Sequence, residues 1–113
     1  MSWGTDQSSL EVKAATCFAF LCRHGFGLDA AVAFAWWQSL RQSPHSKCRW
    51  FVRKLCNYRG SLDGLGPWVL RVIPPRHLVE TLDILVAEHR LSQSHAWSIQ
   101  ERVLHLLNAD GWK

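Results

Sequence analysis

The chain has 113 residues, of which 48% are hydrophobic and 19% are charged, and its formal net charge is +4. This length suits a single domain, and this composition excludes a disordered chain or a fibrous repeat. We therefore expect one domain over residues 1–113, with residues 1–8 as a loose N-terminal lead-in. The positive net charge favours an acidic partner.

The sequence predicts neither a membrane span nor a secreted protein. No uninterrupted apolar run reaches the length of about 18 residues that a transmembrane helix needs, and no secretory leader is recognisable. The four cysteines lie in apolar helical stretches, where a free thiol acts as a small hydrophobic group. We therefore expect a cytoplasmic protein in a reducing compartment, without contact with membranes.

In chain order, the first predicted helix spans about residues 9–23. Ser8 and Glu11 form a capping-box pattern at its start, because a serine is followed three residues later by a glutamate. Gly25 follows the last apolar residues and is typical of a helix end.

The second predicted helix spans residues 30–42, with Asp29 as its N-cap. Apolar side chains cover almost its whole circumference, and two of them are the adjacent Trp36 and Trp37. A helix without a wide polar face is usually central in a fold. We therefore expect its neighbours to pack around it.

The third predicted helix is basic and spans residues 43–59. Ser43 and Pro44 resemble an N-cap and a first helical residue, and Gly60 resembles a left-handed C-terminal stop. At 100° per residue the helix has an apolar arc and a basic arc. The apolar arc comprises Cys48, Phe51, Val52, Leu55 and Cys56. The basic arc and its flanks comprise Arg41, Lys47, Arg49, Trp50, Arg53, Lys54 and Arg59, with no acidic residue among them.

The remaining chain is predicted as a loop followed by two helices. Residues 61–68 contain an Asp-Gly turn signal, and residues 68–73 fit either a short helix opened by Pro67 or an edge strand. Helices are expected over residues 76–90 and, after an N-cap at Ser92 or Ser94, to about residue 107. The fold class is therefore all-α, a compact single-domain bundle of about five helices.

The second and third helices, joined by a short turn, resemble a helix-turn-helix pair, in which the second helix enters a DNA groove. The turn contains a proline and lacks the frequent glycine, so the alternative is a simple antiparallel pair within the bundle.

No pattern predicts catalysis, a metal or a cofactor. Cys22, His24, His45 and Cys48 could meet where two helix ends approach, but their spacing is not a known zinc pattern. No cysteine or histidine carries a local signature of an activated nucleophile. We therefore expect a protein that is not an enzyme and has no metal and no cofactor.

Two functional hypotheses remain open. In the first, the basic residues of segment 43–59 and its flanks contact phosphates of DNA or RNA, and Trp50 stacks on a base or packs on a sugar. In the second, the protein is an interaction subunit or small inhibitor that uses the same face to bind an acidic protein or a second copy. Trp3, Trp50 or Trp112 would then be the anchoring residues.

Overall fold

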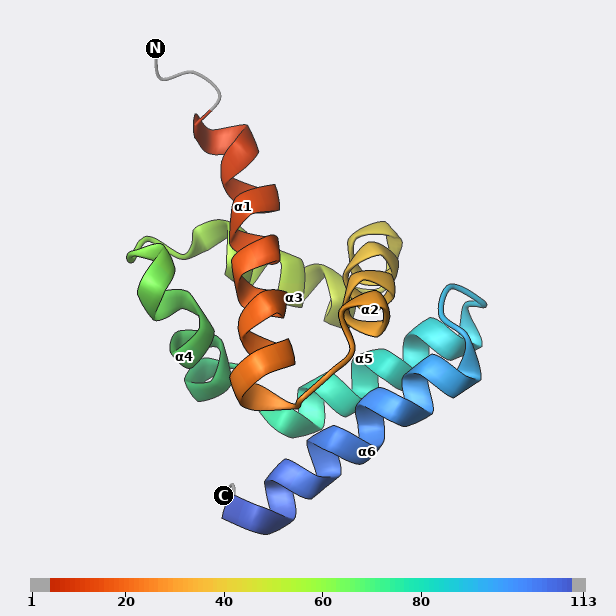
Figure 1. Cartoon of the computed structure of the whole chain (residues 1–113). Helices are drawn as coiled ribbons and strands as arrows, with labels where there is room; N and C mark the ends of the chain where they lie inside the picture. The colour runs from red at the N-terminus through yellow and green to blue at the C-terminus, as the bar shows by residue number, and fades with distance from the viewer. Residues whose placement is uncertain (1–4, 111–113) are drawn as a thin grey trace.

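The computed structural model describes residues 5–110, with side chains over residues 10–24 and 26–105 (Figure 1). This part of the chain is all-helical and contains no strand, which confirms the predicted fold class. The helices are α1 (Thr5–Phe20), α2 (Ala30–Gln42), α3 (Ser46–Asn57), α4 (Leu62–Val72), α5 (Pro75–Ala87) and α6 (Gln93–Asp110), and a π-helical turn (Leu21–Gly25) extends α1. Over these residues the count is therefore six helices, one more than expected.

The additional helix is α4, which covers most of the predicted loop of residues 61–68 and continues into residues 68–73, where a short helix was one of the two predicted alternatives. Its sequence contains Gly64, Gly66 and Pro67, which are turn signals in an isolated chain. Leu65 and Val69 are nevertheless buried against the rest of the protein, with α4 alongside α1 (Figure 1). The tertiary contact with α1 therefore overrides the weak local preference of this segment.

The core is built around α2, which packs against α1, α3, α5 and α6. Trp36 and Leu40 of this helix are completely buried. Phe18 of α1 meets Trp36 edge to face, with ring centroids 5.4 Å apart, and also contacts Trp37 and Phe51. The prediction of a central second helix is therefore confirmed.

Both ends of α1 differ from the prediction. The helix begins at Thr5, so residues 5–8 are helical and Ser8 is not the N-cap. At the other end the π-helical turn extends the helix through Gly25, and Gly27 adopts the left-handed conformation with φ 64°. The amides of Phe26 and Gly27 both donate to the Leu21 carbonyl, at 2.9 and 3.1 Å, and this arrangement closes the turn.

The predicted N-cap of α2 is confirmed, whereas the predicted N-cap of α3 is wrong. Asp29 Oδ1 accepts a hydrogen bond from the amide of Ala31 at 3.0 Å. At α3 the cap is His45, whose Nδ1 accepts from the amide of Lys47 at 3.1 Å. Ser43 instead follows the last turn of α2, where its side chain is buried.

The C-terminal end of α3 also differs from the prediction of a helix that runs to residue 59 and stops at Gly60. The helix ends at Asn57, and Gly60 does not adopt a positive φ. Lys13 of α1 instead donates from Nζ to the carbonyls of Cys56 and Tyr58, at 3.0 and 2.8 Å. A cation at a helix C-terminus pairs with unsatisfied carbonyls and with the negative end of the helix dipole.

The last two helices form a side-by-side pair (Figure 1). Ser92, one of the two predicted N-caps, caps α6: its hydroxyl accepts a hydrogen bond from the amide of His95 at 3.2 Å. The turn before it contains His89 with φ 60°, and the amide of Arg90 donates to the carbonyl of Leu85 at 2.9 Å. This pattern is a Schellman motif with histidine at the position that usually holds glycine.

We predict that Gly66→Ala destabilises the protein. A glycine-to-alanine change inside a helix normally stabilises it by roughly 0.5–1 kcal/mol. Here a Cβ atom would overlap the Phe20 ring of α1, and such overpacking costs about 1–3 kcal/mol. Urea denaturation should therefore give a lower free energy of unfolding. In a Phe20→Leu background the substitution should cost less, and a stabilising Gly66→Ala would refute the close packing of α4 on α1.

Candidate functional site

The structure turns the hydrophobic arc of α3 inward and its basic arc outward. Cys48, Phe51, Val52 and Leu55 are buried, as predicted, but Cys56 is exposed and does not belong to the buried arc. The outward residues with their flanks, which we call the basic face, are Arg41, Lys47, Arg49, Trp50, Arg53, Lys54 and Arg59. Packing of the apolar arc therefore orients the basic face toward solvent.

Two cations of the basic face form ion pairs with acids of other helices. Arg41 Nη1 lies 2.7 Å from Glu11 Oε2 of α1, and Lys47 Nζ lies 3.1 Å from Glu80 Oε1 of α5. The side chains of both pairs are between 41% and 50% exposed. Exposed pairs of this kind contribute only about 0–1 kcal/mol, so a stronger anion can replace the carboxylate.

The other four cations of the basic face have no carboxylate partner among the described residues. These are Arg49, Arg53, Lys54 and Arg59. Arg49 donates from Nη1 to the carbonyl of Arg41 at 3.1 Å, and this bond holds its guanidinium beside the end of α2. The positive charge of this region is therefore largely uncompensated.

Trp50 is half-buried, and its ring already has two neighbours. The imidazole of His77, from α5, lies with its centroid 4.4 Å from the Trp50 ring. The Nζ atom of Lys54 lies 5.1 Å from the ring centroid, which is within the range of a cation–π contact. A base could stack on this ring only if Lys54 moved, so Trp50 is better placed to support its neighbours than to receive a ligand.

A shallow hollow of about 630 Å³ lies between α3 and α5. Its lining residues are Pro44, Ser46, Lys47, Arg49, Trp50, Arg53 and His77. Four of them, Lys47, Arg49, Trp50 and Arg53, were predicted from the sequence as site residues. Arg41, Lys54 and Arg59 do not line it. The hollow thus gathers cations around a half-buried aromatic ring.

His77 is the site residue that sequence reasoning missed. Its Nε2 donates to the carbonyl of Lys47 at 3.0 Å, which links α5 to the first turn of α3. Burial lowers the pKa of this imidazole from 6.5, and the charge of Lys47 acts in the same direction. No local pattern marks this histidine, because its partners lie about 30 residues earlier in the chain.

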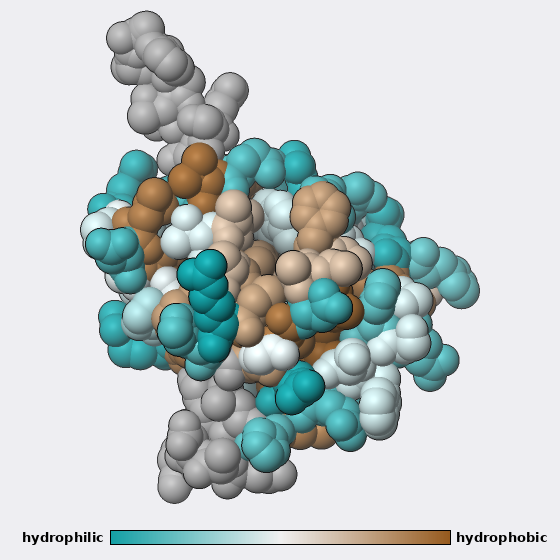
Figure 2. Space-filling view, in the orientation of Figure 1, coloured by the Kyte–Doolittle hydropathy of each residue, from teal (hydrophilic) through white to brown (hydrophobic). Residues whose placement is uncertain are grey.

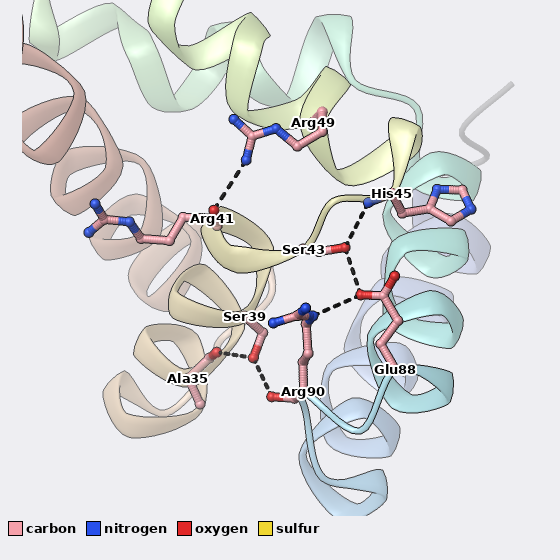
Figure 3. A network of polar contacts seen from close by, with 8 residues as sticks. All are labelled: Ala35, Ser39, Arg41, Ser43, His45, Arg49, Glu88 and Arg90. Carbon is pink, nitrogen blue, oxygen red and sulfur yellow. Dashed lines mark hydrogen bonds and ion pairs between the residues drawn. The ribbon is translucent and has the colours of Figure 1, made fainter.

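A polar network fixes the joint between α2 and α3 (Figure 3). The buried Ser43 hydroxyl donates to Glu88 Oε1 at 2.8 Å and accepts from the amide of His45 at 3.2 Å. Arg90 Nε donates to the same Glu88 oxygen at 3.0 Å. Hydrogen bonds to a charged group are worth about 1.5–3 kcal/mol. The turn after α5 therefore determines where α3 begins.

Ser39 makes a second connection to the same turn. Its hydroxyl donates to the carbonyl of Arg90 at 2.7 Å and lies 2.9 Å from the carbonyl of Ala35, within its own helix (Figure 3). The last turns of α2 are thus tied to the α5–α6 connection at two points. This rigid support positions the N-terminal half of α3 and the hollow beside it.

Burial affects three of the four thiols in the described part of the chain. All four cysteines are free, and burial raises the pKa of Cys17 to about 12 and also raises the pKa values of Cys22 and Cys48. A thiol with a raised pKa is a poor nucleophile at neutral pH. Over the described residues, no three side chains of His, Cys, Asp or Glu converge as metal ligands.

The three tryptophans predicted as anchors, Trp3, Trp50 and Trp112, differ in whether the structure describes them. Trp3 and Trp112 lie outside the described residues, and Trp50 is the half-buried ring of the hollow. Trp97 of α6 is 61% exposed and was not singled out from the sequence, although it has the most solvent-accessible indole among the described tryptophans.

Comparison of the chain with protein-family models finds none that matches, and searches of curated proteins and of solved structures likewise find no match. Among the described residues, none of the helices combines the length and the apolar character that crossing a membrane requires.

We predict that His77 makes the protein less stable at acid pH. Because the folded-state pKa of His77 lies below 6.5, the unfolded chain binds more protons as the pH falls through this range. The free energy of unfolding is therefore fully retained above pH 6.5 and decreases as the pH falls toward the lower folded-state value. In His77→Gln this part of the decrease should disappear. Urea denaturation of both proteins between about pH 7.5 and 5 checks this, and parallel curves would contradict it.

Proposed function

We propose that the protein binds nucleic acid through the basic face of α3. The observation that supports this most strongly is the set of four cations without a carboxylate partner among the described residues, Arg49, Arg53, Lys54 and Arg59. Cations gathered along one helix face attract a phosphate backbone and release its condensed counterions on binding.

The ion pairs of the basic face are compatible with this proposal. Lys47 and Arg41 are exposed and paired with single carboxylates, which a phosphate can replace at little cost. Guanidinium groups such as those of Arg49 and Arg53 bind phosphate oxygens in a bidentate manner. We assign these two arginines the main phosphate contacts, because both line the hollow beside α5.

Trp50 has a supporting role in this proposal. Its contacts with His77 and Lys54 hold the ring in the lining of the hollow. The edge of the Trp50 ring is then available to pack against a sugar. A base could stack on the face of the ring only after Lys54 had moved away from it. Binding therefore depends chiefly on charge, and we expect little discrimination between base sequences from this ring.

An acidic protein partner remains the competing function for the same face. The pair between Lys47 and Glu80 is an example of a carboxylate bound at the edge of the hollow. A protein with closely spaced acids could occupy several of these cations at once. Nucleic acid is favoured because Arg49, Arg53 and Lys54 follow one another along a single helix and Arg59 lies just beyond its end, as phosphates follow one another along a strand.

We predict a salt-dependent affinity that requires Arg49 and Arg53. If about three or four phosphates are contacted, the logarithm of the binding constant should fall against the logarithm of salt with a slope of about −3 to −4. Arg49→Gln/Arg53→Gln should make the slope shallower by about 2. Fluorescence anisotropy with labelled DNA and RNA at several salt concentrations measures both quantities.

The matched control is Arg71→Gln/Arg102→Gln, which removes the same charge from exposed arginines of α4 and α6. This variant should retain the wild-type slope, and circular dichroism should show that both variants fold. Equal losses in the two variants would mean that net charge alone drives binding. Absence of binding at low salt would exclude nucleic acid and direct the search to an acidic protein.

We further predict a preference for double-stranded DNA if α2 and α3 act as a helix-turn-helix pair. The two helices pack together and are joined by three residues, Ser43 to His45. In such a pair the first residues of the second helix, here Ser46, Lys47 and Arg49, face the major groove. Competition of unlabelled duplex against single strands of the same sequence tests this. Equal or weaker binding of the duplex would exclude the groove-binding arrangement.

A further inference from the structure

An apolar groove of about 270 Å³ separates the exposed faces of α1 and α2. Small side chains leave this space open, since Ala14, Ala15, Ala19, Ala30 and Ala33 all line it. Aromatic rings, among them those of Phe18 and Trp37, form the rest of its apolar surface. Figure 2 shows this side of the molecule, where hydrophobic residues gather over and between the two helices within a hydrophilic border.

Phe34 lies at the rim of this groove and is 62% exposed. It projects from the middle of the stretch of α2 that borders the groove, between Ala30 and Gln38. Burying an aromatic side chain of this type is worth about 1.5–3 kcal/mol. The α1/α2 face therefore carries both a protruding Phe34 ring and the apolar groove. In the described part of the chain, no apolar neighbour covers either of them.

The size of the groove indicates what could fill it. Small-molecule sites usually have volumes of about 300–1,000 Å³ and bury most of the ligand. This groove of about 270 Å³ is smaller, which suits an inserted side chain better than a small molecule. A ring such as that of Phe34 from another copy is of the required kind.

The charges at the two ends of the groove support a second copy as the occupant. At one end lies Cys22, with Asp29 and Arg23 near enough to influence its pKa. At the other end lies Glu11, which pairs with Arg41 at 2.7 Å. Each end thus carries one acid and one base.

In a two-fold arrangement the same patch of each copy meets the other, so that each residue contact is made twice. With the two α2 helices antiparallel, Asp29 faces Arg41 of the partner subunit, and Arg23 faces Glu11 of the partner subunit. Opposite charges then meet at both ends of the contact.

We propose that two copies of the chain associate through this α1/α2 face about a two-fold axis, with Phe34 of each copy seated in the groove of the other. The contact depends on one large side chain per copy and on exposed ion pairs. It therefore belongs with small, transient interfaces, with a dissociation constant on the order of 10–100 μM. Binding of nucleic acid to α3 is not required for this association.

We predict that Phe34→Glu abolishes the self-association. Sedimentation velocity from about 1 to about 500 μM protein should show a reversible shift of the wild type from monomer to dimer. Phe34→Glu should remain monomeric throughout, because it would place a charge in an apolar groove. Ala15→Leu, at an exposed position that lines the groove, should weaken dimerisation about tenfold or more by filling the space.

Two further variants test the charge arrangement and the location. Asp29→Asn keeps an N-cap of equal quality but removes the charge, so it should weaken the dimer while the thermal midpoint of unfolding stays unchanged. Trp97→Glu alters a side chain that is as exposed as Phe34 but belongs to α6, and it should dimerise like the wild type. A wild type that stays monomeric, or a dimer lost in Trp97→Glu and retained in Phe34→Glu, would overturn the proposal.

Discussion

Burial of α2 on several sides is the constraint on which the rest of the structure depends. This helix packs against α1, α3, α5 and α6, and Trp36 and Leu40 have no exposed surface. Interiors are packed as densely as organic crystals, so each neighbour of such a helix has little freedom to shift. The fold even tolerates a buried indole N–H at Trp36 that has no hydrogen-bond partner among the described residues. The energy of burying the ring outweighs the cost of its unpaired N–H.

The polar joint after α2 transmits this rigidity to α3. Ser43 is almost wholly buried, and its hydroxyl satisfies both the amide of His45 and the carboxylate of Glu88. Buried polar groups are costly unless paired, so this joint has few alternative geometries. Lys13 closes the other end of α3 through two carbonyls. The basic face is consequently carried by a helix that is fixed at both ends and along its buried arc.

The two candidate surfaces differ in chemistry. The basic face is a set of cations around a hollow of about 630 Å³, with a half-buried ring and His77 in its lining. The α1/α2 face is apolar, with charges only near its ends. Electrostatic attraction acts at a distance and is screened by salt, whereas apolar burial requires close shape matching. The first surface therefore suits an extended polyanion, and the second suits a partner that carries a complementary ring.

The sequence alone determined the helical class, the central position of α2, its Asp29 cap and the inward arc of α3, because these follow from hydrophobic periodicity and local hydrogen bonding. It also located the basic segment, because the basic residues are clustered between residues 41 and 59 of the sequence. Only the tertiary structure decided that Gly66 lies inside a helix, and that His77 joins the hollow. These outcomes depend on contacts between segments far apart in the chain, whose packing and burial energies exceed local preferences of at most about 1 kcal/mol per residue.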